Sequence, residues 1–432
     1  METRVLVLLM LAYVFNFLDR QILSILKIPI KAELGLTNTQ LGLMGGIAFA
    51  SVYSTLAIPL ARYADRNGRA RVIAGAVLFW SSFTALSGTA ANFLQLFLFR
   101  MGVGVGEAGG VAPSYALIAE HVPAQRRARA LAVFSLGIPI GSALGLFGAG
   151  WLAQAFDWRA AFVAIGLAGV PIAMLIGTLI PERPPAAPPL SPPPPNLVDQ
   201  PSFSTTIMLL ARKPSFWLLS LGSAFGSICG YGLGFWLPSY FNSGLGLSLG
   251  STGNYFGSIV LFGGTAGILL GGILADRLGE ARPGAYAAIP AIAFLLTAPL
   301  YAAALFVPSL SIAWLLFAVP YMLSLAWLGP ILTAVQGLVA PPQRATASAS
   351  FLLINNLIGI GFGTFIFGYM SDRMTATYGA EALRYSILYG LVFYLLGAGF
   401  YLLASRHLFR DMVPNEPISD INVELELTSA NV

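Results

Sequence analysis

Long apolar segments separated by short breaks make up most of this sequence. The 432 residues are 57% hydrophobic and only 9% charged, whereas a soluble domain carries about 25% charged residues. Because so few charges cannot cover a water-exposed surface, most of the surface must face lipid. Roughly 20 apolar residues span a bilayer, and the apolar segments account for nearly the whole chain. The sequence therefore predicts an integral membrane protein.

Twelve segments are long enough to cross a membrane, in two groups of six. Each is expected to be a helix, because backbone in lipid must satisfy its own hydrogen bonds. The prediction is an all-α protein of two six-helix bundles related by pseudo-two-fold symmetry. The expected cores are 5–28, 39–63, 71–91, 93–118, 128–151, 159–180, 214–240, 250–274, 284–306, 310–338, 346–370 and 383–405.

A proline-rich stretch at 181–212 is the one long break, and its proline density predicts an extended, semi-rigid linker. We therefore expect an N-terminal bundle at 1–180, a cytoplasmic linker at 181–212, a C-terminal bundle at 213–406 and a cytoplasmic tail at 407–432.

The basic residues predict the orientation. Arginines gather in alternate loops, and on the other side Lys27 and Lys31 are the main exceptions. The positive-inside rule places the arginine-rich loops and both termini in the cytoplasm. The net charge of +5 forms no basic stripe, so no nucleic-acid partner is expected. We expect a monomer in a bacterial inner membrane.

The two halves repeat. Ala64-Asp65-Arg66-Asn67-Gly68 recurs as Ala275-Asp276-Arg277-Leu278-Gly279, each time after the second segment of its half. Pro113 and Gln125-Arg126 match Pro330 and Gln343-Arg344. A six-helix unit that occurs twice indicates a transporter with its site between the halves.

The first copy continues as Asp65-Arg66-x-Gly68-Arg69-x-Arg71 and resembles the signature of the major facilitator superfamily between its second and third helices. The resemblance implies that these residues latch the cytoplasmic side closed. The alternative is a positive-inside cluster that only sets topology, which explains the arginines but not the repeated Asp and Gly. The proposed gate comprises Asp65, Arg66, Arg69, Arg71, Asp276 and Arg277.

Four ionisable residues lie deep in the first and fourth segments. Asp19 and Arg20 follow Asn16 in the first, and Arg100 and Glu107 lie seven residues apart on one face of the fourth. A charge at the bilayer centre costs at least about 2.5–3.5 kcal/mol, so such residues face a cavity or one another and are usually functional.

Two acids and two arginines are neutral as a set when all are ionised. Loss of one negative charge leaves an arginine free to attract an anion, so the set predicts a protonation switch. Asp19 and Glu107 are the expected proton carriers, and Arg20, Arg100 and Asn16 are the expected polar part of a substrate site. The alternative is a static ion-pair network that holds the two helices together.

The second half offers aromatic side chains instead of buried charges. This asymmetry predicts an amphiphilic substrate, with its head on the first half and its apolar part on the second. For any single aromatic residue, ordinary helix packing is the competing interpretation. The candidates are Tyr231, Trp236, Tyr321 and Trp327.

Enzymatic chemistry finds no support in the sequence. Gly104-x-Gly106-x-x-Gly109 matches the dinucleotide-binding string, but it lies inside an apolar helix without the strand that the fingerprint requires. The sequence contains no catalytic motif and no metal-ligand cluster, so we expect neither enzyme activity nor a cofactor. Five prolines, in contrast, are expected to kink their helices: Pro59, Pro113, Pro139, Pro238 and Pro330.

A closer resemblance rests on three strings. Phe15 to Gln21, Gly104-Val-Gly106-Glu107-Ala108 and Gly137 to Gly145 look like bacterial relatives of the spinster family. The Leu-Asp-Arg element also occurs in organic-anion and sugar-acid transporters. The resemblance implies a proton-linked exporter of sphingosine-phosphate-like or lysophospholipid substrates.

The expectation is thus a secondary transporter that moves an amphiphilic anion by alternating access. The alternative is the same fold carrying a small organic anion or sugar acid. An intramembrane enzyme and a passive channel are two further alternatives. An enzyme would need a set of catalytic residues, and a channel would show flux that does not depend on a pH gradient.

Overall fold

The computed structural model describes residues 2–181, 203–279 and 282–413, and every regular element in these ranges is a helix. In the first half the helices are α1 (Glu2–Leu34), α2 (Asn38–Gly45), α3 (Ile47–Asn67), α4 (Arg69–Ser87), α5 (Phe93–Ala108), α6 (Val111–His121), α7 (Ala124–Ser135), α8 (Gly137–Ala155) and α9 (Trp158–Leu179). In the second half they are α10 (Phe203–Ala211), α11 (Pro214–Gly244), α12 (Leu249–Gly279), α13 (Ala285–Ala304), α14 (Leu310–Leu325), α15 (Leu328–Gly337), α16 (Arg344–Tyr378), α17 (Ala382–Gly390) and α18 (Val392–Asp411).

Ten helical stretches of the described chain are long and apolar enough to cross a membrane. One of them, Pro341–Asp411, has 71 residues and contains α16 to α18, which is room for two crossings at about 20 residues each. The remaining crossing is α5 with α6, where Arg100 and Glu107 interrupt the apolar run. The predicted twelve-helix, all-α architecture is confirmed.

Three of the predicted proline kinks are breaks. Pro113, Pro139 and Pro330 are each the third residue of a helix, α6, α8 and α15, that follows directly on another helix. Proline lacks the N–H that would bond to the carbonyl four residues earlier, and its ring crowds that carbonyl. Pro59 and Pro238 instead lie inside the unbroken helices α3 and α11.

The predicted extended linker is wrong for its last part. Residues 203–211 form α10, whose sequence Phe-Ser-Thr-Thr-Ile-Met-Leu-Leu-Ala contains no proline. The prolines that suggested an extended chain lie before it, and residues 182–202 are outside the described ranges. The tail boundary also shifts, because α18 continues to Asp411.

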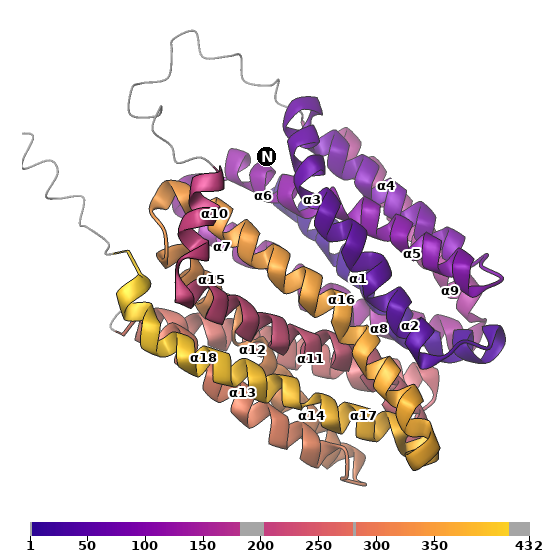
Figure 1. Ribbon diagram of the computed structural model, residues 1–432. Coiled ribbons are helices and arrows are strands. Elements are labelled where there is room, and N and C mark those ends of the chain that lie inside the picture. The colour runs from indigo at the N-terminus through magenta and orange to yellow at the C-terminus, as the bar shows by residue number, and fades with distance from the viewer. Residues whose placement is uncertain (1, 182–202, 280–281, 414–432) are drawn as a thin grey trace, which may run out of the picture.

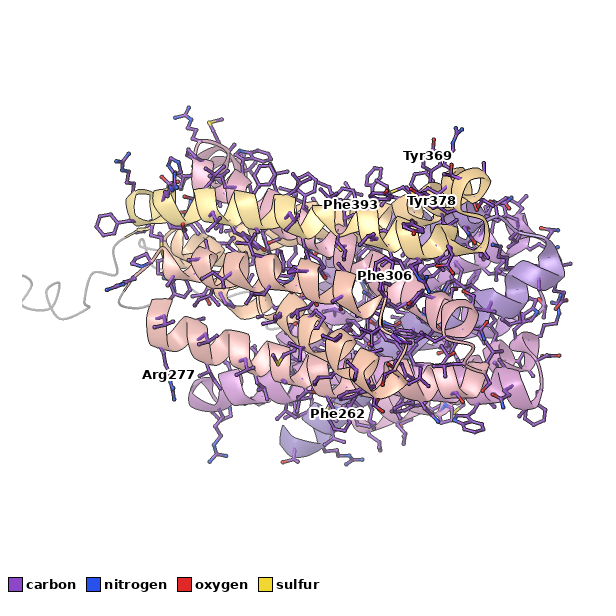
Figure 2. All side chains as sticks on the ribbon, turned by 90° about the horizontal axis from the view of Figure 1, so that it is seen from below. Phe262, Arg277, Phe306, Tyr369, Tyr378 and Phe393 are labelled. Atoms are coloured by element: carbon purple, nitrogen blue, oxygen red, sulfur yellow. The ribbon has the colours of Figure 1, made fainter. Side chains whose placement is uncertain are left out.

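The two halves lie side by side (Figure 1), with the indigo-to-magenta helices of the first half against the pink-to-yellow helices of the second. Across the interface α8 packs along α12, α2 and α3 pack along α16, and α1 packs on α11. Large apolar side chains such as Phe262 and Phe306 are exposed on the outside of the bundle (Figure 2). An apolar exterior of this kind suits contact with lipid.

Candidate functional site

The centre of α1 is bound to α5 by an ion pair. Arg20 Nε donates to Glu107 Oε2 at 2.7 Å, and the side chain of Glu107 is completely buried. Hydrogen bonds between ionised groups are the stronger ones in proteins. This pair therefore fixes the position of α1 relative to α5.

A second ion pair lies one residue earlier on α1. Asp19 Oδ1 is 3.5 Å from Arg100 Nη1, and Asp19 Oδ2 accepts a 2.6 Å hydrogen bond from Thr84 Oγ1 of α4. Asp19 and Arg100 are both 3% exposed. The structure thus gathers all four predicted ionisable residues between α1, α4 and α5.

Several atoms of this cluster have no hydrogen-bond partner among the described residues. They include Glu107 Oε1, Asp19 Oδ1 and the Nε and Nη1 atoms of Arg100. Buried polar groups in folded proteins are nearly always hydrogen-bonded to protein or water. The two carboxylate oxygens are therefore placed to take a proton, and the Arg100 nitrogens to donate to water or a substrate group.

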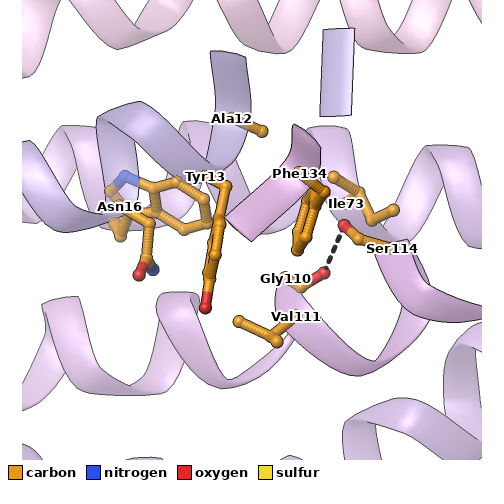
Figure 3. Close-up of a pocket in the computed structure, with 9 residues that line it drawn as sticks. Ala12, Tyr13, Asn16, Ile73, Gly110, Val111, Ser114 and Phe134 are labelled. Carbon is orange, nitrogen blue, oxygen red and sulfur yellow. Dashed lines mark hydrogen bonds between the residues drawn. The ribbon is translucent and has the colours of Figure 1, made fainter. Parts of the chain in front are cut away.

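Asn16 lies next to the charged cluster and lines a small pocket (Figure 3). Within the described part of the chain, neither the oxygen nor the nitrogen of its amide has a hydrogen-bond partner. The centre of a water molecule can occupy a volume of about 10 Å³ within this pocket. The pocket therefore has room for about one water molecule. The predicted site residue Asn16 therefore has space for a solvent partner. The pocket is formed by Ala12, Tyr13, Asn16, Ile73, Trp80, Gly110, Val111, Ser114 and Phe134.

Aromatic rings surround the guanidinium of Arg20. Its Cζ is 4.7 Å from the ring centres of both Phe49 and Tyr53, and 5.0 Å from that of Phe17. Tyr231 of α11 packs against the same apolar cluster as Phe49 and Tyr53. The structure thus brings the predicted residue Tyr231 from the second half to the charged centre.

The other predicted aromatic residues are used in packing. Trp236 is 1% exposed and donates its indole N–H to the Thr364 carbonyl. Tyr321 packs edge-on against Phe256, and Trp327 against Phe351. The competing interpretation, helix packing, describes the contacts that the structure gives these three side chains.

Two of the predicted gate residues of the first half, Asp65 and Arg69, pair with each other. Arg69 Nε donates to Asp65 at 2.8 Å, and Arg69 also pairs with Glu120 of α6. Arg66 and Arg71 are exposed. In the second half Arg277 is exposed at the end of α12 (Figure 2), while the Asp276 side chain lies outside the described part of the chain. A latch between the halves at this arginine-rich end stays a prediction.

The opposite end of the bundle holds contacts between the halves that the sequence reasoning missed. Asp372 of α16 accepts hydrogen bonds from the backbone N–H groups of Asn38 and Thr39 at the start of α2. Trp151 Nε1 donates to Asn254 Oδ1 at 3.0 Å across α8 and α12. One signal was present: Gly368-x-x-x-Asp372-Arg373 repeats the spacing of Gly272-x-x-x-Asp276-Arg277.

Lys27 is a second residue whose place the sequence did not reveal. It lies within the expected first segment, as an exception to the charge asymmetry of the loops, and in the structure it is 1% exposed inside α1. Its Nζ donates to the carbonyl oxygens of Ser24 and, across the interface, of Phe235. Its position two residues before Pro29 gave no sign of these partners.

Comparison with known proteins agrees with this architecture. The sequence pattern of the Major Facilitator Superfamily matches residues 9–364. An MFS-type efflux pump of Mycolicibacterium smegmatis is 37% identical over 401 residues, which cover 92% of this chain and 91% of that protein. A probable L-galactonate transporter of Escherichia coli is 29% identical over 64% of this chain and 62% of its own length.

A solved structure is also similar. It is a bacterial homologue of the human lysosomal transporter Spinster in an inward-facing, unoccupied conformation, with a TM-score of 0.87 at 29% identity, covering 96% of this chain and 99% of that one. The predicted resemblance to bacterial spinster-family homologues is confirmed. With twelve crossings, two repeated halves and a family match over most of its length, this chain belongs to the major facilitator superfamily of membrane transporters.

Proposed function

We propose that this protein is a proton-coupled secondary transporter that moves an amphiphilic anion by alternating access. The observation that carries the proposal is the buried pair between Arg20 and Glu107, at 2.7 Å with the second Glu107 oxygen unpartnered. A neutral Glu107 no longer holds the guanidinium by charge. Protonation of Glu107 therefore releases Arg20 to bind an anionic group.

Asp19 and Arg100 supply a second pair of the same kind. Thr84 holds one oxygen of Asp19, and the other faces Arg100 at 3.5 Å. A proton on Asp19 would weaken the hold on Arg100 in the same way. Acids and arginines arranged as two pairs couple proton binding to anion binding, because each proton frees one positive charge.

The substrate class follows from the surroundings of Arg20. Phe17, Phe49, Tyr53 and Tyr231 provide an aromatic wall beside the cation. A polar head against Arg20 and an apolar chain along these rings suit a lysophospholipid or a sphingosine-phosphate-like molecule, as the spinster resemblance implies. Trp236, Tyr321 and Trp327 are proposed to act only through packing.

A small organic anion or sugar acid is the second candidate. The likeness to a probable L-galactonate transporter supports it, and Arg20 or Arg100 would then bind a carboxylate. Such a substrate needs no aromatic wall, so the two candidates differ in their dependence on Tyr53 and Tyr231.

The arginine-rich end is proposed to be cytoplasmic, with both termini on that side of a bacterial inner membrane. The opposite end is then the outer end. Hydrogen bonds between the halves at Asp372 and Trp151 close the outer end, which supports an inward-facing state. In the outward-facing state the cytoplasmic end is proposed to be closed by Asp65, Arg66, Arg69, Arg71, Asp276 and Arg277.

We further propose a monomer with bundles at 1–180 and 213–406.

Transport by the purified protein in liposomes tests this proposal. Uptake of 1-oleoyl lysophosphatidate and of L-galactonate is compared with and without a pH gradient. Lysolipid transport that rises with the gradient is the expected result. Transport of L-galactonate alone would replace the lipid by the small anion, and flux of either that ignores the gradient would contradict proton coupling.

A further inference from the structure

Lys27 is a buried lysine without an acidic partner among the described residues. Its side chain is almost fully covered, at 1% exposure. Its Nζ donates to two backbone carbonyls and lies 4.5 Å and 5.3 Å from the ring centres of Phe235 and Trp236. Carbonyl dipoles and aromatic faces attract a cation, but they do not neutralise its charge.

Lys27 therefore adds to the interior a basic group that no acid of the described residues balances. Around the two ion pairs, Arg100 and Lys27 are buried basic residues and the Arg20 side chain is 14% exposed, while Asp19 and Glu107 are the buried acids. The two acids are occupied by the two arginines. When all five groups are ionised, one positive charge is left, and it belongs to Lys27. Such an interior attracts a singly charged anion.

Lys27 lies on the same side of α1 as Arg20, but nearer the outer end. The two residues are seven positions apart, which is two helical turns and a rise of about 10 Å. They thus lie at two levels on one side of α1. Arg20 is at the level of the proton-carrying acids, and Lys27 lies beyond them.

The cover over Lys27 comes from the second half of the protein. Phe235 and Trp236 belong to α11, and the Trp236 indole bonds to Thr364 of α16. A Cβ atom on Gly45 of α2 would lie 2.5 Å from the Phe235 ring, so α2 packs tightly against Phe235. Separation of the halves at the outer end would remove this cover and expose Lys27.

We propose that Lys27 is a second anion-binding position, which takes the negatively charged group of the substrate from Arg20 when the outer end opens. In the inward-facing state Lys27 Nζ donates a hydrogen bond to the carbonyl oxygen of Phe235. In the outward-facing state that bond is broken, and the anion replaces it. This inference rests on the proposed function and adds to it an anionic substrate group and a path along α1.

Exchange transport in liposomes tests the role of Lys27. The probes are 1-oleoyl lysophosphatidate, which is anionic, and 1-oleoyl lysophosphatidylcholine, which has the same chain and a zwitterionic head. The variants are Lys27→Met and Lys27→Arg, with Lys31→Met as the matched control. Lys31 is an exposed lysine of the same helix that donates to the Asn38 side chain, so its variant also loses one charge and one hydrogen bond.

We expect Lys27→Met to lower lysophosphatidate exchange at least tenfold relative to lysophosphatidylcholine exchange. Lys27→Arg should keep at least a third of the wild-type ratio, and Lys31→Met should stay within twofold. Binding of lysophosphatidate to the purified inward-facing protein should be unchanged in Lys27→Met, because Lys27 is covered in that state. If Lys27→Met does not fold, as judged by gel filtration, Lys27→Gln takes its place.

Two results would overturn the inference. One is wild-type exchange of lysophosphatidate in Lys27→Met. The other is an equal loss for both lipids, which would assign Lys27 to packing or closure. Failure of the proposed function looks different, because the wild-type protein would then transport neither probe.

Discussion

Asp372 of α16 accepts hydrogen bonds from both the backbone N–H of Thr39, at 2.7 Å, and its hydroxyl, at 2.6 Å. The two residues are 333 positions apart and belong to different halves. Thr39 lies in the first turn of α2, where backbone N–H groups are unpaired and the helix dipole favours negative charge. A Cβ on Gly368 would lie 2.4 Å from the Asn38 carbonyl, so glycine is what permits this approach. Asp372 therefore joins the halves at the proposed outer end.

Asp372→Asn should weaken closure of the outer end. The amide keeps the shape but loses the negative charge, and hydrogen bonds to charged groups contribute about 1.5–3 kcal/mol. We expect the population of the outward-open form to rise about tenfold or more. Spin labels at Ala32 and Ala376 report the distance between the halves by electron paramagnetic resonance. The labels are introduced in a Cys229→Ser background, because Cys229 is the sole cysteine of the sequence.

The matched control is Asp157→Asn. Asp157 caps α9 by accepting from the Ala160 N–H at 2.6 Å, entirely within the first half. This variant loses the same kind of charge and should leave the label distance unchanged. An unaltered distance in Asp372→Asn would refute the idea that this carboxylate holds the outer end closed.

Glu107→Gln should abolish transport driven by a pH gradient while the protein stays folded. The glutamine amide cannot bind and release a proton. Arg20 therefore cannot alternate between a paired and a free state. We expect at least a tenfold loss of gradient-driven accumulation, with exchange less affected. Glu33→Gln is the control, because Glu33 is half exposed and pairs with Arg159 away from the centre. Gradient-driven accumulation at the wild-type rate in Glu107→Gln would exclude Glu107 as the proton carrier.

Asp19→Asn should destabilise the protein through Arg100. The variant leaves a guanidinium that is 3% exposed without its counter-charge, and breaking a buried pair costs about 3–5 kcal/mol. Removing Arg100 as well, in Asp19→Asn with Arg100→Gln, should recover about 0.5–3 kcal/mol of that loss. Unfolding in detergent micelles gives the four free energies of the cycle. Strict additivity of the two single changes would mean that Asp19 and Arg100 do not interact.

Gly145→Ala should displace α8 from α1. A Cβ at Gly145 would lie 2.5 Å from the backbone oxygen of Leu18, directly before Asp19, and overpacking of this kind costs about 1–3 kcal/mol. Gly148→Ala is the control on the same helix, because a Cβ there meets nothing within 4 Å. We expect a lower melting temperature and slower transport in Gly145→Ala only. Equal melting temperatures for the two variants would show that α8 adjusts without moving α1.

The fold was largely predictable because its signals are local. Each crossing is a stretch of apolar residues, and Pro113, Pro139 and Pro330 mark breaks by a rule that acts over four residues. The break between α17 and α18 at Leu391 has no such residue and was not predicted. Helix α10 was missed because the prolines before it dominated the interpretation of the whole linker.

The site was predictable as a set of residues but not as a set of pairs. Asp19, Arg20, Arg100 and Glu107 stand out because charge is expensive in a membrane. That Arg20 pairs with Glu107, and Asp19 with Arg100, depends on the rotation of α1 against α5. Helix rotation also decides which of the four aromatic candidates reaches the charged centre. Of these four, only Tyr231 packs in the cluster beside Arg20.

The number of crossings, the repeat of the two halves and the charged residues inside the membrane can all be read from the amino-acid sequence. The partners of Lys27 and Asp372 become visible in the folded protein alone, because Phe235 is 208 residues from Lys27 and Thr39 is 333 residues from Asp372. Apolar length and proline positions act within one helix. Contacts between helices depend instead on how closely the backbones approach, and that distance is set by packing, as at Gly145 and Gly368.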